Sequence, residues 1–534
     1  MAKPKTPNQK RKYGELNKRI AKYVMLVESI YEDLNLEAAK IVGITDFTID
    51  SDRPFMWSDY PQTRKRIRDL QERFVEDIGA VIYSGTSEEW KNSNEVQDLL
   101  ANKVLQTYGA TIGKEKYEIL YQPNNDALKA FQQRKDKGFT ISDKLWNQST
   151  LYKQELEEAI SCAIQKGTSA ITLSKQISKY LLDFPQLQKD YKERFGKASR
   201  AMDCEYRSIR LAASEINMAY RQAENLRWQQ MDFVVGYEIK LSGSHHIDDI
   251  CDQLKGKYPK TFVWTGWHPN DMCYKIPILK TEEEFWEWDG RSEATTASVN
   301  EVKDVPDAFK KWVLDNQERI STAKKRNTLP YFLRDNKSVY QKITVESSIS
   351  EIVKRASSVG DEVQSIAERI AIKNGGYVTP INFKSTTSIT RKVITEGITP
   401  YDIKDAVRTT IIVPKSRIED VLEELYKTEG FLRLKRQKPE SFMGYSGNIV
   451  NIRTTNGLTA EIQVNTERMI FAKERPEDAK RILGKKRWEE IHNETGMEGG
   501  LGHKYYEQWL ILDKSSNEAL KIVEKSIEYY SHFR

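Results

Sequence analysis

The sequence contains 534 residues with a formal net charge of +6, and 39% of the residues are hydrophobic and 30% are charged. This composition excludes an intrinsically disordered chain, and no stretch approaches the roughly 18 consecutive apolar residues of a membrane-spanning helix, so we expect no membrane anchor. The length favours two to four domains, and four cysteines are too few for a disulfide framework, which indicates synthesis in a reducing cytosol.

Residues 1–24 predict a basic N-terminal arm. They contain eight Lys or Arg residues and one acidic residue, Glu15. No apolar segment typical of a secretory signal peptide follows Met1. The positive charge favours contact with phosphates or with an acidic protein surface. A solvated, frayed terminus explains the same residues equally well.

Residues 25–235 predict a helical module, because apolar residues recur at three- and four-residue steps, for example over 151–167 and 206–230. In the second of these stretches we expect Ser214, Glu215 and Asn217 to face solvent. At residue 233 the pattern changes to the β-type run FVVGYEIKLS. Residues 236–280 are therefore predicted to form a small α/β cap on the helical module.

The predicted cap contains three residues that can bind zinc: Cys251, His268 and Cys273. A closed structural site needs a fourth ligand, for which His245, His246 and Asp252 are candidates. Their spacing does not form paired Cys-x-x-Cys motifs. The alternative, which we favour here, is a hydrogen-bonded turn around Trp267, His268 and Pro269 that packs on the strand.

The succession IRLAASEINMAYRQAENLRWQQ, DICDQLKGKYP and WHPNDMCYKIPIL, within residues 140–280, resembles the Mu F-type phage head morphogenesis (minor head protein) family. That family has additional cysteines beside Cys251 and Cys273, and their absence here weakens the zinc hypothesis. The resemblance implies a low-copy virion protein in the head interior near the portal. It would contact portal and head proteins and, through the basic N-terminal arm, packaged DNA. It would be made in the bacterial cytoplasm and could be ejected with the DNA into the host cytoplasm.

Residues 281–345 mix acidic, Trp-rich and Lys-rich pieces without a sustained period, and we expect an ordered connector or strap. A helix is predicted over 348–373, ending at Gly375-Gly376. Helical and β-type patterns then alternate, so residues 346–512 are predicted to form a separate α/β domain. A polar C-terminal helix, 513–534, is expected to fray at Arg534.

Two pieces of this domain concentrate charge. Residues 382–393 (NFKSTTSITRKV) are compatible with a helix on which Lys384, Ser388 and Arg391 share one face, with Lys392 beside it. Residues 401–413 end in a β-branched run, with Asp405 at its start and Arg408 nearby. These residues would line a cleft with a cationic wall.

A third piece, 444–466, predicts two strands joined by a tight turn at Asn456-Gly457. Period-two alternation places Glu461, Gln463 and Asn465 on one polar face. Two carboxylates on separate strands, together with Lys and Arg side chains, suit a nucleotide triphosphate. Mg²⁺ is held by one or two carboxylates plus phosphate oxygens, and phosphoryl chemistry needs mainly positioning and charge neutralisation.

In this order the pieces resemble the RelA/SpoT pyrophosphotransferase (alarmone synthetase) domain over about residues 350–510. The resemblance implies that ATP donates its pyrophosphate to the 3′-hydroxyl of a guanine or adenine nucleotide or of a tRNA end. It implies Mg²⁺ at Asp405 and Glu461, and triphosphate contacts by Lys384, Lys392 and Arg408. The matching nucleotide-binding positions are Ser385, Arg391, Gly444, Tyr445, whose ring would stack on the acceptor base, Gln463 and His503.

The sequence departs from that family at four positions: Asn382, Thr410, Ser441 and Ile449 stand where two arginines, a lysine and a histidine are usual. Arg408, Lys435 or Lys438 could compensate. The overall prediction is a multidomain α plus α/β protein, with a mostly helical N-terminal half and a RelA/SpoT-like mixed-sheet domain. We expect an effector or toxin enzyme carried by a phage head protein. The alternative is a purely structural head protein whose C-terminal domain binds nucleotide or nucleic acid without turnover.

Overall fold

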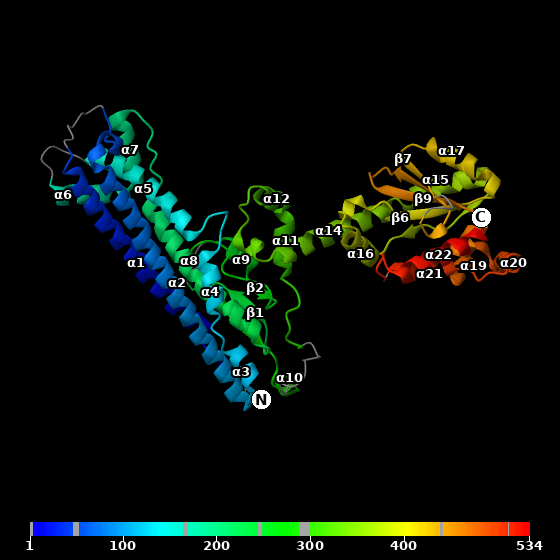
Figure 1. Cartoon of the computed structure of the whole chain (residues 1–534), viewed down its shortest axis with the longest axis horizontal. Coiled ribbons are helices and arrows are strands. Elements are labelled where there is room, and N and C mark those ends of the chain that lie inside the picture. Colours follow the sequence, from blue (N-terminus) through cyan, green and yellow to red (C-terminus); the bar gives the residue numbers. More distant parts are fainter. Residues whose placement is uncertain are drawn as a thin grey trace. The chain divides into compact units, whose positions relative to one another are not determined.

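The computed structural model describes residues 4–45, 53–163, 169–243, 248–287, 298–437, 442–510 and 512–534. The chain divides into two units, Met1–Tyr340 and Gln341–Arg534, which can be followed by colour in Figure 1. Among the described residues, no helix combines the length and apolar character needed to cross a membrane.

The first unit is built on three long helices, α1 (Gln9–Val42), α2 (Arg64–Tyr108) and α8 (Cys204–Gln230), which pack side by side (Figure 1). The predicted helical character of this part is confirmed. Shorter helices complete it: α3 (Lys114–Leu120), α4 (Asn125–Gln133), α5 (Ile141–Ala163), α6 (Ala170–Leu182) and α7 (Phe184–Phe195), with single 3₁₀ turns η1 (Trp57–Asp59) and η2 (Pro61–Thr63).

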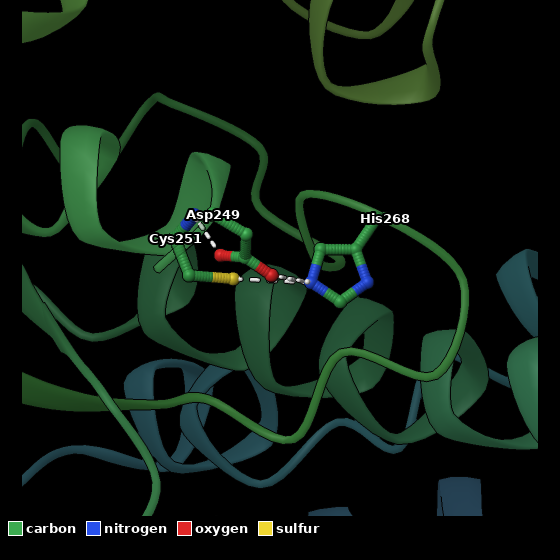
Figure 2. Close-up of side chains that lie close together, drawn as sticks. All are labelled: Asp249, Cys251 and His268. Atoms are coloured by element: carbon green, nitrogen blue, oxygen red, sulfur yellow. Dashed lines mark hydrogen bonds and ion pairs between the residues drawn. The ribbon is translucent and has the colours of Figure 1, made fainter. Parts of the chain in front are cut away.

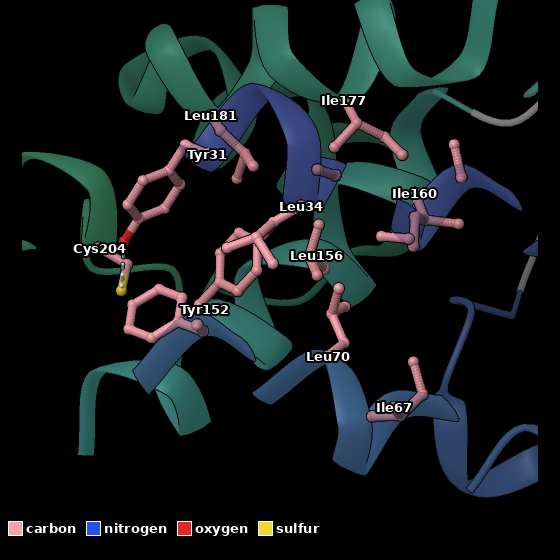
Figure 3. Close-up of a cluster of buried hydrophobic side chains, with 14 of the residues drawn as sticks. Tyr31, Leu34, Ile67, Leu70, Tyr152, Leu156, Ile160, Ile177, Leu181 and Cys204 are labelled. Atoms are coloured by element: carbon pink, nitrogen blue, oxygen red, sulfur yellow. Dashed lines mark hydrogen bonds between the residues drawn. The ribbon is translucent and has the colours of Figure 1, made fainter. Parts of the chain in front are cut away.

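A buried apolar cluster holds one end of these helices together (Figure 3). Leu34 comes from α1, Leu70 from α2, Leu156 from α5 and Ile177 from α6, and none is more than 3% exposed. Burying each such side chain stabilises the fold by roughly 1.5–3 kcal/mol. The cluster therefore fixes the helical scaffold by packing rather than by charge.

The basic N-terminal segment is not a separate arm. From Gln9 it forms the first turns of α1, and Asn8 caps this helix by accepting a hydrogen bond from the Arg11 amide. Tyr13 and Leu16 are buried, and the Tyr13 hydroxyl donates to Glu224 at 2.6 Å. The prediction of a frayed terminus is wrong for these residues because every third or fourth side chain packs against the unit.

On α8, the expectation that Glu215 and Asn217 face solvent is wrong. Both are buried. Glu215 accepts from Arg134 at 2.6 Å, and Asn217 donates to the Asp271 carbonyl at 2.9 Å. Neighbouring elements cover both sides of the helix, so its polar side chains are paired inside the unit.

The predicted cap contains a three-stranded antiparallel sheet in the order β2-β1-β3, made of β1 (Val234–Lys240), β2 (Gly256–Tyr258) and β3 (Tyr274–Leu279), with α9 (Ile250–Leu254) beside it. Within the segment predicted as a connector, 281–345, the described part that contains Phe309 and Phe332 packs against this cap, since both rings contact that of Trp267. Its helices are α10 (Glu282–Glu287), α11 (Asp307–Asp315), α12 (Gln317–Lys325) and α13 (Tyr331–Arg334).

The second unit contains a mixed sheet in the order β4-β6-β9-β8-β7, with β5 also paired to β6. Only the β6–β9 pair is parallel among the pairs of this sheet in the described residues. The predicted mixed-sheet α/β character is confirmed. The strands are β4 (Tyr377–Val378), β5 (Asn382–Phe383), β6 (Val407–Ile412), β7 (Phe431–Arg436), β8 (Asn448–Arg453) and β9 (Thr459–Asn465).

The helix predicted over 348–373 is two helices, α14 (Lys337–Ser358) and α15 (Gly360–Lys373). They meet at Gly360, where a Cβ atom would lie 2.6 Å from the Phe383 ring. The other helices of the unit are α16 (Thr386–Glu396), α17 (Ile418–Tyr426), α18 (Glu467–Lys473), α19 (Pro476–Leu483), α20 (Lys485–Thr495), α21 (Leu501–Leu510) and α22 (Asn517–Ser531), with short 3₁₀ turns η3 (Pro400–Asp402), η4 (Lys415–Arg417) and η5 (Phe442–Gly444).

The two faces of this sheet differ in character because side chains alternate along each strand. On one face Val407, Ile462 and Val450 join a core with residues of α15 and α17. On the other face Arg408 of β6 lies beside Glu461 of β9, which pairs with Asn451 of β8. The sheet thus buries its apolar face and leaves a polar face on the central strands.

The C-terminal helix α22 is packed and does not fray. Tyr529, Tyr530 and Phe533 are at most 4% exposed. Ser526 donates to the Met443 carbonyl at 2.8 Å, and Arg534 donates to the Gly444 carbonyl at 2.9 Å. The predicted frayed terminus is wrong because aromatic residues anchor it behind the Gly444–Tyr445 segment.

Candidate active site

Asp405 is held between two lysines at the start of β6. Lys384 Nζ lies 2.5 Å from Asp405 Oδ2, and Lys392 Nζ lies 3.1 Å from Oδ1. Strand β5 pairs with β6 and brings Lys384 to this point, where its amide donates to the Ala406 carbonyl at 2.9 Å. Helix α16 then returns Lys392 to the same carboxylate.

The electrostatics of this cluster favour an ionised Asp405 with excess positive charge around it. Burial acts to raise the pKa of Asp405, but the Lys384 hydrogen bond and the charges of Lys384 and Lys392 outweigh it and lower that pKa. The three side chains remain 13–28% exposed. Two cations on one carboxylate leave a net positive charge that a phosphate group can meet.

The segment 382–393 is not one helix, which corrects the predicted shared face. Asn382 and Phe383 belong to β5, and α16 begins only at Thr386. Ser385 caps α16, accepting from the Ser388 amide at 3.2 Å. Arg391 is exposed on α16, whereas Lys384 precedes the helix. The side chains that meet are Lys384 and Lys392, and they do so through Asp405.

A second polar cluster lies on β9. The predicted turn at Asn456-Gly457 is confirmed: Gly457 has a positive φ of 78° and joins β8 to β9. Gln463 donates to Glu461 Oε1 at 2.7 Å, and Lys473 at the end of α18 donates to Gln463 Oε1 at 2.9 Å. The turn and the strand alternation thus set Glu461 and Gln463 side by side, as predicted.

Tyr445 joins this cluster. Asn465 donates to the Tyr445 hydroxyl at 2.7 Å, Lys473 Nζ lies 5.6 Å from the ring centroid, and the Tyr530 ring meets it edge-on at 5.7 Å. Gly444 precedes it with a φ of 73°, and a Cβ atom there would lie 2.5 Å from the Ile527 Cα of α22. Glycine is therefore required where α22 supports the Tyr445 segment.

Arg408 and His503 connect to this cluster through Glu474. Burial acts to raise the pKa of Glu474, but the positive charges of Lys473, Arg408 and His503 lower it. His503 also lies 3.1 Å from Glu507. Arg408 pairs in register with Glu461. Asp405 precedes Arg408 by three residues, and each strand residue advances about 3.3 Å, so the backbones of Asp405 and Glu461 are offset by about 10 Å along the strand direction.

The departures from the alarmone synthetase pattern can be placed only in part. Asn382 pairs in register with Arg408, so a guanidinium does lie next to the place of one missing arginine. Ile449 pairs with Gln463 on one side and with Lys435, which is exposed, on the other. Thr410, also beside Gln463, is buried. Lys438 and Ser441 lie outside the described residues.

Sequence reasoning missed Lys473 and Glu474, and it did not foresee the Asn465–Tyr445 hydrogen bond. Asn465 was visible as the next polar position of the β9 alternation. Lys473 carried no such signal, because its place in the site depends on the angle at which α18 leaves the strand.

Two of the predicted zinc ligands, Cys251 and His268, lie together in the first unit beside Asp249 (Figure 2). Cys251 Sγ lies 3.2 Å from His268 Nε2, and Cys251 also hydrogen-bonds Cys273. This bond and burial raise the pKa of the Cys251 thiol. Asp249 and Asp252 both take part in the capping box of α9. Asp249 Oδ1 accepts from the Cys251 amide at 2.6 Å, and its Oδ2 lies 3.2 Å from His268 Nε2. His245 and His246 lie outside the described residues.

Comparison with known proteins shows which proteins part of this chain resembles in sequence. A stretch of 181 residues, 34% of this chain, is 35% identical to the (p)ppApp synthetase toxin Tas1 of Pseudomonas aeruginosa strain UCBPP-PA14. Part of this chain is therefore similar to a synthetase toxin. The stretch covers 41% of Tas1, so the chain spans less than half of that relative's length. No protein-family model matches the chain.

Two solved structures are also similar. The type VI effector Tas1, solved with its immunity protein, is 35% identical and aligns over 35% of this chain and 97% of that chain, with a TM-score of 0.33. The small alarmone synthetase 1 of Bacillus subtilis is 16% identical over 34% of this chain and 92% of that chain, with a TM-score of 0.22. These scores do not establish a shared fold, so the sequence identity to Tas1 carries the comparison. It supports the predicted alarmone synthetase resemblance, while the resemblance to phage head proteins receives no support and stays a prediction.

Proposed function

We propose that the second unit is a pyrophosphotransferase that moves the β,γ-pyrophosphate of ATP to the 3′-hydroxyl of a nucleotide, and that the chain acts as a toxin. The observation that carries this proposal is the 35% identity to a (p)ppApp synthetase toxin over 181 residues. The lysine-bracketed Asp405 and the Glu461–Gln463 pair supply groups for this chemistry. The relative's product makes an adenine nucleotide the first acceptor to test, with guanine nucleotides and tRNA as alternatives.

In this proposal the main role of the positively charged side chains is to bind the triphosphate and neutralise its charge. Lys384 and Lys392 bind the anionic triphosphate and share their charge between it and Asp405, while Arg408 acts from the adjoining strand position. Charge neutralisation of this kind is the main demand of phosphoryl transfer. The excess positive charge at Asp405 supports this role.

The carboxylates fit a Mg²⁺ site of the usual composition, one or two carboxylates completed by phosphate oxygens. Asp405, whose pKa is lowered, and Glu461 would hold the ion. Bound Mg²⁺ would neutralise charge on the transferring phosphates. The half-buried Tyr445 ring, fixed by Asn465 and Tyr530, would orient the acceptor base, with Gly444, Gln463, Lys473 and His503 around it.

The test is label transfer by the full chain from ATP in the presence of Mg²⁺, with AMP, ADP, ATP, GDP, GTP and tRNA as separate acceptors. We expect a labelled adenine nucleotide. Glu461→Gln removes a metal-binding carboxylate and should lower the rate by about 100-fold or more. Glu477→Gln, a matched change at an exposed position of α19, should leave the rate unchanged. A wild-type chain that labels none of these acceptors would falsify the proposal.

The place of the chain in a phage head is a separate proposal that depends on residues 140–280. If it holds, purified particles contain the intact chain at a few copies each, near the portal. Recovery of the chain only from the cytosolic fraction of producing cells would contradict it, without affecting the enzymatic proposal.

A further inference from the structure

We propose that Asp249, Cys251, His268 and Cys273 form a binding site for one zinc-type divalent cation in the first unit. The inference is independent of the transferase proposed for the second unit. It rests on Asp249, Cys251 and His268, whose donor atoms lie within 4.8 Å of one another (Figure 2), and on Cys273, whose Sγ lies within 4.8 Å of that of Cys251. The occupant is a borderline-soft cation, because the set combines two thiols, an imidazole and a carboxylate.

Two donors face the same imidazole nitrogen. Cys251 Sγ and Asp249 Oδ2 each lie 3.2 Å from His268 Nε2. Ligands of a tetrahedral zinc ion lie about 3.4–3.6 Å apart, given Zn–N near 2.0 Å and Zn–S near 2.3 Å. The observed separations therefore need to widen by only a few tenths of an ångström to admit the ion.

The orientation of His268 fits a metal ligand. Its Nδ1 lies 2.8 Å from the Pro269 carbonyl oxygen, which can only accept, so Nδ1 carries a proton. In the neutral ring this leaves the lone pair on Nε2, aimed at Cys251 and Asp249. A cation placed between Nε2 and the Asp249 carboxylate would receive this lone pair and offset the carboxylate charge. Hydrogen bonding of the second nitrogen to a carbonyl is the usual way in which proteins orient a metal-binding histidine.

The same geometry excludes a nucleophilic Cys–His–Asp triad. In such a triad the carboxylate holds the nitrogen opposite to the one that faces the nucleophile. Here Asp249 and Cys251 share Nε2, and the other nitrogen is bound to Pro269. Cys251 is also only 1% exposed, so a substrate could not reach its sulfur.

Cys273 is the fourth ligand in this proposal. Its Sγ groups with Cys251 and Asp271 rather than with Asp249 and His268, so the loop that carries Cys273 would move toward them when the ion binds. Cys251, Cys273 and Asp271 place their donor atoms within 4.8 Å of one another. The Asp271 carboxylate, however, already accepts from the amides of Trp267 and Cys273, at 2.7 and 2.8 Å. We therefore assign Asp271 a positioning role and leave Cys273 as the ligand.

Buried Arg221 supports the same loop from α8, donating to the carbonyls of Thr265, Asp271 and Cys273. Access comes from the other side, since the side chains of His268 and Asp249 are 37% and 34% exposed. Binding would replace the thiol protons of Cys251 and Cys273, which pass to solvent, by two metal–sulfur bonds. The ion would then join α9 to the loop before β3.

The test measures zinc in the purified full chain by inductively coupled plasma mass spectrometry, together with reconstitution of the metal-free chain with Co²⁺. We expect about one zinc per chain, and a Co²⁺ spectrum with thiolate-to-metal charge-transfer bands and intense tetrahedral bands. Cys251→Ala should lower occupancy by about tenfold or more. Cys162→Ala, a change at a half-buried cysteine outside the cluster, should not.

If Cys251→Ala does not fold, Asp249→Asn and His268→Gln test the same site at its more exposed ligands and should each lower zinc occupancy. A wild-type chain that carries no zinc and gives only the spectrum of aqueous Co²⁺ overturns the proposal. So does a Cys251–Cys273 disulfide found by mass spectrometry of the chain alkylated without reduction.

Discussion

Two lysine–carboxylate clusters, one in each unit, use the same chemical groups in opposite ways. In the first unit Lys275 and Glu224 are both 0% exposed, with Nζ 3.6 Å from the carboxylate. Tyr13 donates to Glu224 at 2.6 Å, Lys275 hydrogen-bonds Asn225, and the Trp228 ring lies 4.6 Å from Lys275 Nζ. In the second unit one carboxylate, Asp405, faces two lysines and the cluster is open to solvent.

The difference separates a structural pair from a binding site. In the closed cluster burial raises the pKa of Glu224 and lowers that of Lys275, so the surroundings penalise either charge on its own. Arg221 also acts on Glu224, and both members of the pair are fully buried. In the open cluster the two lysines leave an excess of positive charge that solvent can reach. Exposure, rather than residue type, decides which cluster can bind phosphate.

The largest effect on stability is expected from breaking the closed pair. Lys275→Met leaves Glu224 buried without its cation, and loss of one partner of a buried pair costs about 3–5 kcal/mol. Urea unfolding of the full chain, followed by amide hydrogen exchange in α8 and β3, measures this loss. Lys257→Met, at an exposed position of the same sheet, should change the free energy of unfolding by less than about 0.5 kcal/mol. Equal effects of the two variants would show that the buried pair is not structural.

The open cluster should respond in the opposite way. Asp405→Asn removes the charge that holds the two lysines and, under the proposed function, a metal ligand, so we expect transfer of pyrophosphate to fall by about 100-fold. The free energy of unfolding should change by no more than about 1 kcal/mol, because these side chains are partly solvated. The change to Asn at Asp478 in α19, whose side chain is 46% exposed, is the control and should alter neither quantity. A loss of stability as large as that of Lys275→Met would instead place Asp405 with the structural pairs.

The sequence predicted some of this contrast and missed the rest for physical reasons. Strand alternation and the Asn456-Gly457 turn placed Glu461 beside Gln463, because both depend on local geometry. The pairing of Lys384 with Lys392 was expected on one helix but is formed between a strand end and a helix, through Asp405. The closed Lys275–Glu224 pair joins α8 to β3 across many residues, and Lys473 depends on the direction of α18. Such contacts are set by tertiary packing, which no local pattern encodes.

Packing of α22 behind Gly444 and Tyr445 should matter as much as the charges of the candidate site. Gly444→Ala forces a Cβ to within 2.5 Å of Ile527 Cα at a positive φ, which should displace α22 or Tyr445 and cost about 2 kcal/mol. Gly496→Ala is the control, because Gly496 also has a positive φ, of 64°, in the left-handed helical region, but no atom within 4 Å of the added Cβ. The difference between the two melting temperatures isolates the contact with α22. If the two variants melt together, α22 is not a rigid support of the site.

A further predicted effect is a pH dependence of stability that arises in the buried interior of the first unit. Glu155 accepts from the amides of Met202 at 2.6 Å and Cys204 at 3.0 Å, but burial outweighs these bonds and raises the pKa of Glu155 from 4.5 to about 7. Between these values the folded state binds more protons than the unfolded state, so the free energy of unfolding falls as the pH rises through this window. Glu205, with its pKa raised to about 7 mainly by burial, adds a fall in the same direction.

Glu155→Gln removes one of these two titrations, so the loss of stability between about pH 5 and about pH 8 should become smaller without disappearing. Urea unfolding at the two pH values, followed by hydrogen exchange in α5 and α8, measures it. Glu193→Gln, at an exposed position of α7, should leave the wild-type fall unchanged. Glu155→Gln could instead lose as much stability between these pH values as the wild type does. That result would mean that the Glu155 carboxyl is solvated in the folded chain. The contrast between a closed first unit and an open site in the second would then be weaker than the burial of Glu155 indicates.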